Sequence, residues 1–481
     1  MNRRNIGIGI VVACCLSLGS LSGQHTDDYR KQFDRFQQQT ESRFDTFRDS
    51  TNRVYAEYLS RSWEQFGIQA PKPVPKKPLP VEDTQYIPGE DSVPAVLPID
   101  TVTIPAHQEV ETHPVPEAPE RTSAPSLRLQ YFGTSVEMSR FDGFQISLPA
   151  VDEHQVSACW LQLSQQPYRP FIREIVSLKE TLNLNDWALY RLLIQVSDAY
   201  FPPTQTNAKT VFTVFMLNQI GYRVKIGRQG GRLLPLIAFR TEVYGKRYIS
   251  LPDGNYYVFG SDNASVSQVF SYRLNYGSAM AGISLAVTKP FRLDMAPGAS
   301  ELRFEGKVYT IAYNRNLIDL YKTFPQTELT VYANTPLSSA TRRSLEKELL
   351  PSLKDKEEDE ALTFLLTFVQ KAFPYKTDQA QFGYEKYFFV EELFHYPYSD
   401  CEDRAVLFAQ LVRRFIGLEV VLLDYPDHVA TAVKQKKRVE GDYINVNNER
   451  YIVCDPTYIG APVGKAMTRC KEEKARVLAL N

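Results

Sequence analysis

Cysteine, histidine and net charge are all scarce in this chain of 481 residues. It has 6 Cys and 6 His, and its 55 Lys and Arg nearly balance its 56 Asp and Glu, for a net charge of -1. Six cysteines are too few for a disulfide scaffold. General polyanion binders carry surplus Lys and Arg, so no nucleic-acid partner is expected. The histidines are scattered without ligand spacing, so neither a metal nor another cofactor is expected.

A long apolar run is also missing after the first two dozen residues. Residues 1–5 are basic, residues 6–16 are apolar, and small residues follow before the first acidic residues. A membrane helix needs about 20 apolar residues, so the pattern predicts a signal peptide over residues 1–23. We expect a mature chain without a membrane span that is extracytoplasmic, either periplasmic or secreted. An uncleaved anchor and a lipidated Cys14 are the alternatives.

Aromatic residues recur every eleven positions in residues 24–68. Phe33, Phe44, Tyr55 and Phe66 form the clearest row. Eleven residues make three helical turns, so the row lies along one face of a predicted amphipathic helix. Such a face is usually buried. It is expected to pack on the protein itself or to self-associate, and a protein partner is the other possibility.

Proline is concentrated in one part of the chain. Of the 30 prolines, 13 lie between Pro71 and Pro125. Residues 69–127 are therefore predicted to be a Pro-rich linker, extended and semi-rigid rather than folded.

Cys401 opens a predicted helix near the C-terminus. Ser399 and Glu402 have the spacing of a capping box, which makes Ser399 the N-cap and places Cys401 in the first helical turn. A helix N-terminus favours a thiolate and offers backbone N–H groups to an oxyanion. The acidic neighbours Asp400, Glu402 and Asp403 oppose thiolate formation, so a base is also required.

Two predicted strands supply a histidine and a carboxylate. Residues 427–433 alternate so that His428 lies on a face with small residues, and residues 451–455 end with Asp455 before a proline. The order is Cys, His, Asp, with spacings of 27 (428 − 401) and 27 (455 − 428). Taken singly, each residue type is usually structural. Together they suggest a nucleophile, a base and an orienting group.

Residues 360–460 resemble the core of the transglutaminase-like superfamily of papain-like cysteine enzymes. The matching features are a Cys that opens a helix, a strand His, and a strand Asp followed by Pro-Thr. The sequence Asp-Cys-Glu-Asp-Arg-Ala at 400–405 also resembles a bacterial cysteine-peptidase branch. The resemblance implies Cys401 as nucleophile, His428 as general base and acid, and Asp455 as the group that orients His428. Many relatives have His-Ala-Trp where this chain has His-Val-Ala, which leaves the substrate open.

An earlier segment looks like a second copy. Residues 186–200 and 359–373 share seven residue identities at a constant offset of 173 (359 − 186). With strand positions aligned at an offset of 194, His428 falls on Leu234 and Asp455 on Ser261. The copy therefore lacks the catalytic residue types and is expected to bind a partner or to be purely structural. Chance similarity between two α/β regions is the alternative.

The expected fold class is α+β, with a C-terminal papain-like, transglutaminase-like core. The expected domains are the signal peptide, the helix, the linker, a degenerate copy over 128–270, a small β-rich segment over 271–336, and a catalytic domain over 337–481. Of the remaining cysteines, Cys454 is expected in the core, and pairing of Cys159 with Cys470 is left open.

The expected function is acyl transfer at amide bonds of peptides or proteins, by a secreted peptidase or amidase that forms a thioester. A transglutaminase that cross-links protein glutamines is the second possibility. A non-catalytic extracytoplasmic assembly or binding protein with a vestigial triad is the third.

Overall fold

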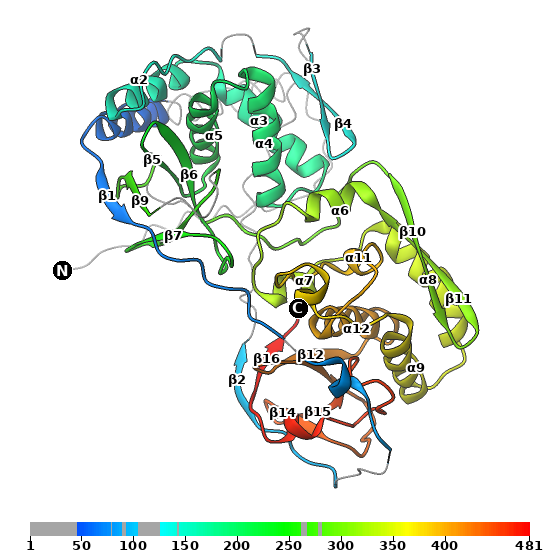
Figure 1. Cartoon of the computed structure of the whole chain (residues 1–481). Helices are drawn as coiled ribbons and strands as arrows, with labels where there is room; N and C mark the ends of the chain where they lie inside the picture. Colours follow the sequence, from blue (N-terminus) through cyan, green and yellow to red (C-terminus); the bar gives the residue numbers. More distant parts are fainter. Residues whose placement is uncertain are drawn as a thin grey trace, which may run out of the picture. The chain divides into compact units, whose positions relative to one another are not determined.

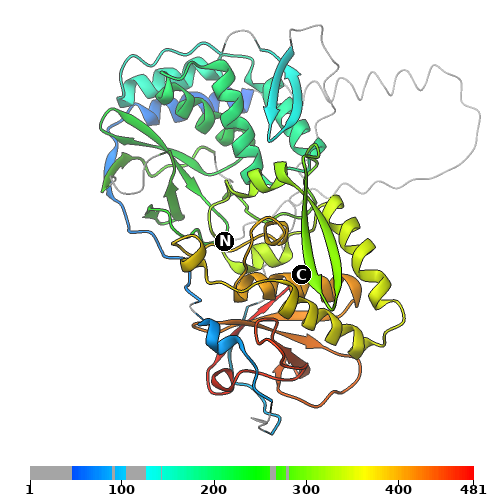
Figure 2. The same ribbon diagram turned by 45° about the vertical axis from the view of Figure 1, so that its right-hand side comes forward.

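The chain is a mixed α+β protein, and its computed structural model is shown in Figures 1 and 2. The structure describes residues 46–77, 79–88, 93–103, 126–141, 144–260, 267–277 and 281–481. The predicted signal peptide, Cys14 and the first half of the predicted aromatic helix lie outside these residues. Among the helices of the described residues, none combines the length and apolarity that a membrane crossing requires.

The N-terminal helix ends earlier than its aromatic period predicts. Residues 46–59 are helical, and Phe66 lies instead in strand β1 (Glu64–Gly67). β1 pairs antiparallel with β9 (Gln268–Ser271), so pairing with a distant segment overrides the helical period. Tyr55 of the aromatic row is buried, and its ring centroid lies 5.0 Å from that of Trp160. At this position the aromatic face packs on the protein itself.

A six-stranded antiparallel sheet forms the first folded region, with the order β1-β9-β5-β6-β8-β7. Its other strands are β5 (Val224–Gln229), β6 (Arg232–Ala238), β7 (Tyr248–Leu251) and β8 (Gly254–Val258). The helices of this region are α2 (Glu153–Ser164), α3 (Tyr168–Thr181), α4 (Asp186–Tyr200) and α5 (Thr206–Ile220). α5 packs on β5 and β6, and its apolar residues on every side are buried as expected for a central helix.

Two hairpins and three helices complete the middle of the chain. β3 (Ser126–Tyr131) pairs with β4 (Thr134–Ser139), and β10 (Pro297–Phe304) pairs with β11 (Lys307–Asn314). The β10–β11 turn has positive φ at Glu305 and Gly306, as a tight two-residue hairpin requires. α6 (Arg315–Tyr321), α7 (Leu329–Asn334) and α8 (Ser339–Leu353) follow.

The C-terminal region holds a second six-stranded sheet, with the order β14-β15-β13-β12-β16-β2. Its strands are β2 (Ile99–Thr103), β12 (Glu419–Asp424), β13 (Val429–Lys434), β14 (Tyr443–Val446), β15 (Glu449–Cys454) and β16 (Ala475–Ala479). The helices are α9 (Glu358–Ala372), α10 (Asp378–Gln381), α11 (Val390–Leu393) and α12 (Cys401–Phe415), with the 3-10 turn η2 (Thr468–Lys471). α12 packs against α9, β12 and β13.

The two sheets have the same strand order. Read from its other edge, the first sheet runs β7-β8-β6-β5-β9-β1, and each strand corresponds in chain order to one of β14-β15-β13-β12-β16-β2. Each sheet is preceded by a central helix, α5 or α12, and each takes its last strand from residues 64–103. The one difference in pairing is that β1 is antiparallel to β9 whereas β2 is parallel to β16.

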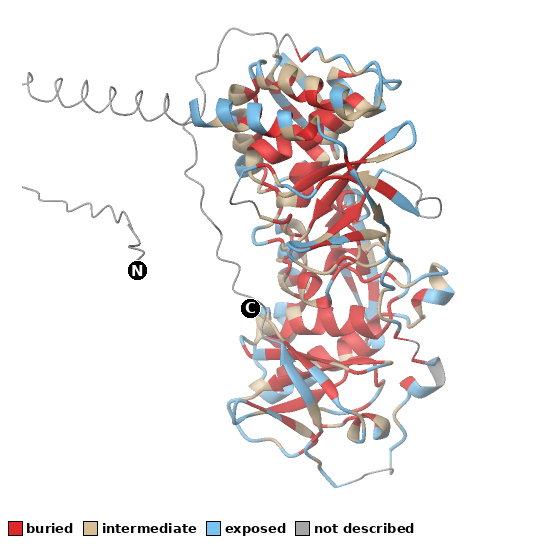
Figure 3. Cartoon of the chain, turned by 90° about the vertical axis from the view of Figure 1, so that its left-hand side faces the viewer, coloured by how far each residue is buried: buried red, intermediate tan, exposed pale blue. Residues whose placement is uncertain are grey.

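The described residues of the Pro-rich segment are not a solvated spacer. Lys77, Leu79 and Leu97 are buried, and β2 is part of the C-terminal sheet. The short helix η1 (Val81–Thr84), blue in Figures 1 and 2, lies against this sheet. Prolines that break regular structure leave a chain extended, and an extended chain can lie along a protein surface. Figure 3 shows buried residues gathered on the strands and on the helices packed against them.

Candidate functional site

Cys401 is the first residue of α12, within the first helical turn where the spacing predicts it. The N-cap, however, is Asp400 rather than Ser399, and the N–H of Asp400 donates to the Asp403 carboxylate at 3.3 Å. Both residue types favour this position, so the sequence left a one-residue ambiguity. The Ser399 hydroxyl instead accepts a hydrogen bond from Arg404 Nε at 3.2 Å.

The Cys401 thiol is closed off from solvent. Its relative exposure is 0 %, and Sγ donates to Glu402 Oε2 at 3.0 Å. Burial, followed by the charges of Glu402 and Asp400, raises the pKa of the thiol well above its usual value, while a hydrogen bond from the Val429 N–H opposes the rise. In this arrangement the sulfur is protonated and lies beside the start of β13.

His428 and Asp455 are in direct contact. His428 Nε2 lies 2.8 Å from Asp455 Oδ2, and both side chains are buried. Asp455 Oδ1 accepts hydrogen bonds from the N–H groups of Thr457 and Tyr458 at 2.9 and 3.2 Å. These bonds fix the carboxylate, and the carboxylate in turn fixes the imidazole. His428 precedes β13 and Asp455 follows β15, so adjacent antiparallel strands bring the two residues together.

Of the three predicted site residues, His428 and Asp455 thus form a hydrogen-bonded pair, and Cys401 lies near them without a hydrogen bond to either. His428 Nδ1 is buried without a hydrogen-bond partner, so no hydrogen bond joins it to Cys401. The sulfur contacts the N–H of Val429, the residue next to His428. The thiol proton is directed to Glu402 rather than to the imidazole.

Four buried carboxyl groups surround the start of α12. Asp378, Asp400, Glu402 and Asp403 are each at most 2 % exposed. Burial is the main cause of raised pKa values in all four, to about 8 for Asp378 and about 6 for Asp400. Protons on these groups lower the cost of burying them.

Two sets of these carboxyl groups could hold a cation. Asp378, Asp400 and Asp403 place one oxygen each within 4.8 Å of one another, and so do Asp378, Glu385 and Glu402. Oxygen ligands of this kind suit hard divalent cations.

Arg404 and Tyr375 complete the surroundings. The Arg404 side chain is fully buried, donates to the Phe373 carbonyl, and has its guanidinium 5.2 Å from the centre of the Tyr375 ring. Burial lowers its pKa to about 10, but it remains a positive charge beside Asp400 and Asp403. Tyr375 was missed in the sequence, because it lies 26 residues before Cys401 (401 − 375) with no motif of its own.

The remaining cysteines, and the histidine and tyrosine of the loop before α12, have structural surroundings. Cys454 is in the core as predicted, and Cys159, Cys401, Cys454 and Cys470 are all free thiols, so no disulfide joins Cys159 to Cys470. His395 Nδ1 lies 3.2 Å from the Tyr313 hydroxyl. Tyr398 is partly exposed and lies under the Lys376 ammonium, at 4.9 Å.

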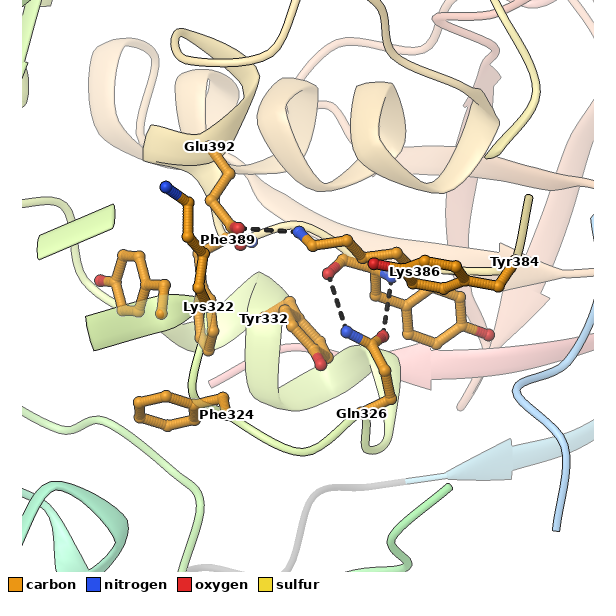
Figure 4. Close-up of a pocket in the computed structure, with 10 residues that line it drawn as sticks. Lys322, Phe324, Gln326, Tyr332, Tyr384, Lys386, Phe389 and Glu392 are labelled. Atoms are coloured by element: carbon orange, nitrogen blue, oxygen red, sulfur yellow. Dashed lines mark hydrogen bonds and ion pairs between the residues drawn. The ribbon is translucent and has the colours of Figure 1, made fainter. Parts of the chain in front are cut away.

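A small pocket of about 150 Å³ lies beside this site (Figure 4). Its wall holds a buried ion pair between Lys386 Nζ and Glu392 Oε1 at 2.7 Å. Tyr387 also lines it, and burial and then the charge of Glu402 raise the pKa of this tyrosine. The lining has aromatic rings and charges but neither cysteine nor histidine, so it offers no second Cys–His pair.

The first sheet has different residues at the matching positions. The registers Val224 with Ile237 and Val420 with Val433 align β5–β6 with β12–β13 at an offset of 196, which places Arg232 at the position of His428. β8, which pairs with β6, corresponds to β15, which pairs with β13. These registers align at an offset of 195, which places Gly260 at the position of Asp455.

The strand registers thus give counterparts that differ from the sequence alignment, which pairs His428 with Leu234 and Asp455 with Ser261. Arg232 Nη2 donates to the Gly260 carbonyl at 2.5 Å. The geometric counterpart of the His–Asp contact is therefore a contact with no acid–base chemistry.

Comparisons of the chain with protein-family models, curated proteins and solved structures gave no match.

Proposed function

We propose that the chain is a cysteine-dependent acyl-transfer enzyme that acts on amide bonds of peptides or proteins. The observation that carries the proposal is the buried contact of 2.8 Å between His428 Nε2 and Asp455 Oδ2. Nδ1 of the same imidazole has no hydrogen-bond partner, and the N–H of the next residue, Val429, acts on the Cys401 thiol. A cysteine at a helix start, a histidine held by a carboxylate and nearby N–H groups are the parts that such catalysis uses.

Each part has a role in the proposed reaction. Once the thiol turns from Glu402, its proton passes to His428 Nδ1 and the sulfur attacks the carbonyl carbon. The imidazolium then gives this proton to the leaving amine as the C–N bond breaks, and a thioester forms. Water next loses a proton to His428 and attacks the thioester, the C–S bond breaks, and the proton returns to the sulfur. Asp455 keeps the imidazole in position and stabilises its charged form.

The proposal includes a papain-like core and a duplication of it. In support of the first, α12 packs on β13, the strand that follows His428, and β13 pairs with β15, the strand that precedes Asp455. In support of the second, the first region has the same strand order and a central helix at the same place. Its Arg232–Gly260 contact makes it the non-catalytic copy. We also propose that the protein acts outside the cytoplasm, on the basis of residues 1–23.

Hydrolysis is the first choice because no residue of the described site marks a place for a second amine. A transglutaminase reaction would replace water by a lysine amine at the thioester step. Intact-mass detection of a small amine joined to a glutamine-containing peptide would favour that alternative. An assembly protein with a vestigial triad would show neither reaction.

The pH profile of Cys401 alkylation tests the enzyme proposal. Iodoacetamide modification is measured by peptide mapping between pH 5 and 9 in the native chain and in His428→Gln. The shape of the profile is the readout, because occlusion of the sulfur lowers the rate at every pH. We expect the native chain to react at pH 6 at least about tenfold faster than the variant, since histidine pairing supports the thiolate.

Identical profiles in the two chains would overturn the enzyme proposal. Cys159 provides the internal control, because its buried thiol has no histidine partner and its pKa is raised by burial alone.

A further inference from the structure

A segment of the chain crosses the end of the sheet where His428 and Asp455 lie. Its described residues are Lys77 and 79–86, which include the short helix η1 and fall within the Pro-rich part of the sequence. We call it the strap. It contacts a residue near each member of the proposed triad, and the three triad side chains are 0, 0 and 1 % exposed.

The first contact is a buried lysine. Lys77 Nζ donates to Asp424 Oδ1 at 2.6 Å and to the carbonyl of Tyr425, and only 4 % of the lysine side chain is exposed. The N–H of Tyr425 in turn donates to the His428 carbonyl at 2.9 Å. A carboxylate and a carbonyl that converge on one ammonium form a site for a cationic side chain.

The second contact is at the cysteine. The Tyr375 hydroxyl donates to the Leu79 carbonyl at 2.8 Å, and Tyr375 forms an isolated β-bridge with Ser399, two residues before Cys401. The Leu79 side chain is fully buried in an apolar cluster with Tyr425, Ala430 and Val453. This cluster lies on the strands that carry His428 and Asp455.

The third contact is at the carboxylate. The N–H of Ile459 donates to the Thr84 carbonyl at 2.6 Å, and the N–H of Tyr86 donates to the Ile459 carbonyl at 3.0 Å. Asp455 accepts from the N–H groups of the turn that leads to Ile459. The strap is thus bound by main-chain hydrogen bonds at one end and by a charged side chain at the other, as extended peptides are bound elsewhere.

We propose that the strap occupies the polypeptide-binding groove of the enzyme and keeps it closed. Asp424 and the Tyr425 carbonyl then form the subsite for a basic side chain, Lys77 being its internal ligand, and the groove takes an extended polypeptide with lysine or arginine at this position. The role of the groove rests on the proposed function, whereas closure of Cys401 by the strap does not.

The test compares alkylation rates of Cys401 at pH 8.5 in the full chain. Lys77→Met removes the charge and nearly preserves the length, so we expect at least a tenfold faster reaction. Lys77→Arg keeps the charge and should stay within about threefold of the native rate. Lys72→Met is the matched control, because Lys72-Pro73-Val74 has the same pattern as Lys77-Pro78-Leu79 and Lys72 binds Glu242 instead, at 2.6 Å.

Each outcome decides the proposal. An unchanged rate in Lys77→Met would overturn closure by the strap, and an equal increase in Lys77→Arg would overturn the subsite for a basic side chain. An equal increase at Cys159 and Cys454 would mean general loosening of the fold and would also overturn it. Leu79→Ser provides a second route to opening and should raise the Cys401 rate without affecting Cys159.

The same variants in a His428→Gln background separate this proposal from the enzyme proposal. Opening of the strap still raises the Cys401 rate there if the strap closes the groove. Failure of the triad would instead appear as the absence of any His428 effect in the opened chain.

Discussion

The two six-stranded sheets share a strand order but differ in the chemistry at one end. In the C-terminal sheet, a cysteine opens the central helix and a histidine contacts a carboxylate. In the first sheet, Thr206 opens the helix and Arg232 contacts the Gly260 carbonyl. The comparison teaches that strand order alone does not determine activity, since a few side chains at the strand ends separate a proposed catalyst from a scaffold.

The two regions also differ in the charged side chains that they bury. The first sheet buries a lysine, Lys225, whose ammonium donates to the carbonyls of Arg273 and Leu274 at 2.8 and 3.0 Å. The C-terminal region buries a group of carboxyl groups around Asp378 and Asp400. We therefore expect stability in the two regions to change with pH in opposite directions.

The largest expected difference is at the two helix starts. In a chain opened by Lys77→Met, Cys401→Ala should reduce turnover of a p-nitrophenyl ester by at least about 10³-fold, because the nucleophile is lost. Thr206→Ala, at the same place in the first region, should leave turnover unchanged. Equal rates in the Cys401→Ala chain and its parent would remove the functional contrast between the sheets.

The next largest effect is expected at Asp455. Asp455→Asn keeps an oxygen for the Thr457 and Tyr458 N–H groups but replaces the oxygen that faces His428 by an amide donor. Turnover of the same ester should fall by about 10²- to 10⁴-fold, since the imidazole loses its orienting acceptor. Circular dichroism should show the fold retained. A turnover within threefold of the parent would contradict the assigned role of Asp455.

Removal of a buried acid should stabilise the C-terminal region. Burial raises the pKa of Asp378 to about 8, so the folded state holds its proton while the unfolded chain releases it above about pH 4. This group therefore makes folding less favourable as pH rises from about 4 to about 8.

Asp378→Asn should accordingly raise the unfolding free energy at pH 8 by about 1 kcal/mol or more, and with it the melting temperature. The gain should be smaller toward pH 4. The measurement is calorimetry in buffer with a chelator, so that no cation neutralises the carboxyl groups. A gain that is the same at both pH values would refute the linkage.

Lys225→Met tests the opposite pH dependence in the first region. Burial lowers the pKa of this lysine to about 7, so between about pH 7 and 10.5 the unfolded chain binds the extra proton and stability rises with pH. The variant should lose this rise in calorimetric scans from pH 7 to 9.5. Its stability at pH 7 should change little, because loss of two hydrogen bonds offsets removal of a buried charge. A rise as steep as in the native chain would exclude Lys225 as its source.

The smallest effect is expected at Arg232. Arg232→Ala removes the contact with Gly260 at the position that matches His428, yet the arginine side chain is exposed. Unfolding free energy should stay within about 0.5 kcal/mol of the native value, and Cys401 reactivity should not change. A loss of reactivity in this variant would show that the first region takes part in catalysis.

Local patterns predicted the elements that carry the site. Capping residues and an apolar period located the start of α12, and alternation located β13 and β15, because these signals act over a few residues. The carboxyl group Asp378 and the hydroxyl of Tyr375 were not predicted, since only the tertiary fold brings them to Cys401. The Pro-rich composition favours an extended chain but contains no information on the surface that the chain lies against.

β2 also has a consequence for the order in which the protein is made. Among the described strands, β2 pairs with β16 alone, and 371 residues separate Thr103 from Ala475 (474 − 103). During synthesis the N-terminal residues leave the ribosome long before their partner exists, and closing so long a loop costs conformational entropy. Until residues 475–479 emerge, β2 has no partner strand, so this edge of the C-terminal sheet forms only after those residues have been synthesised. For the same reason, a fragment that begins at residue 337 would lack one edge strand of this sheet.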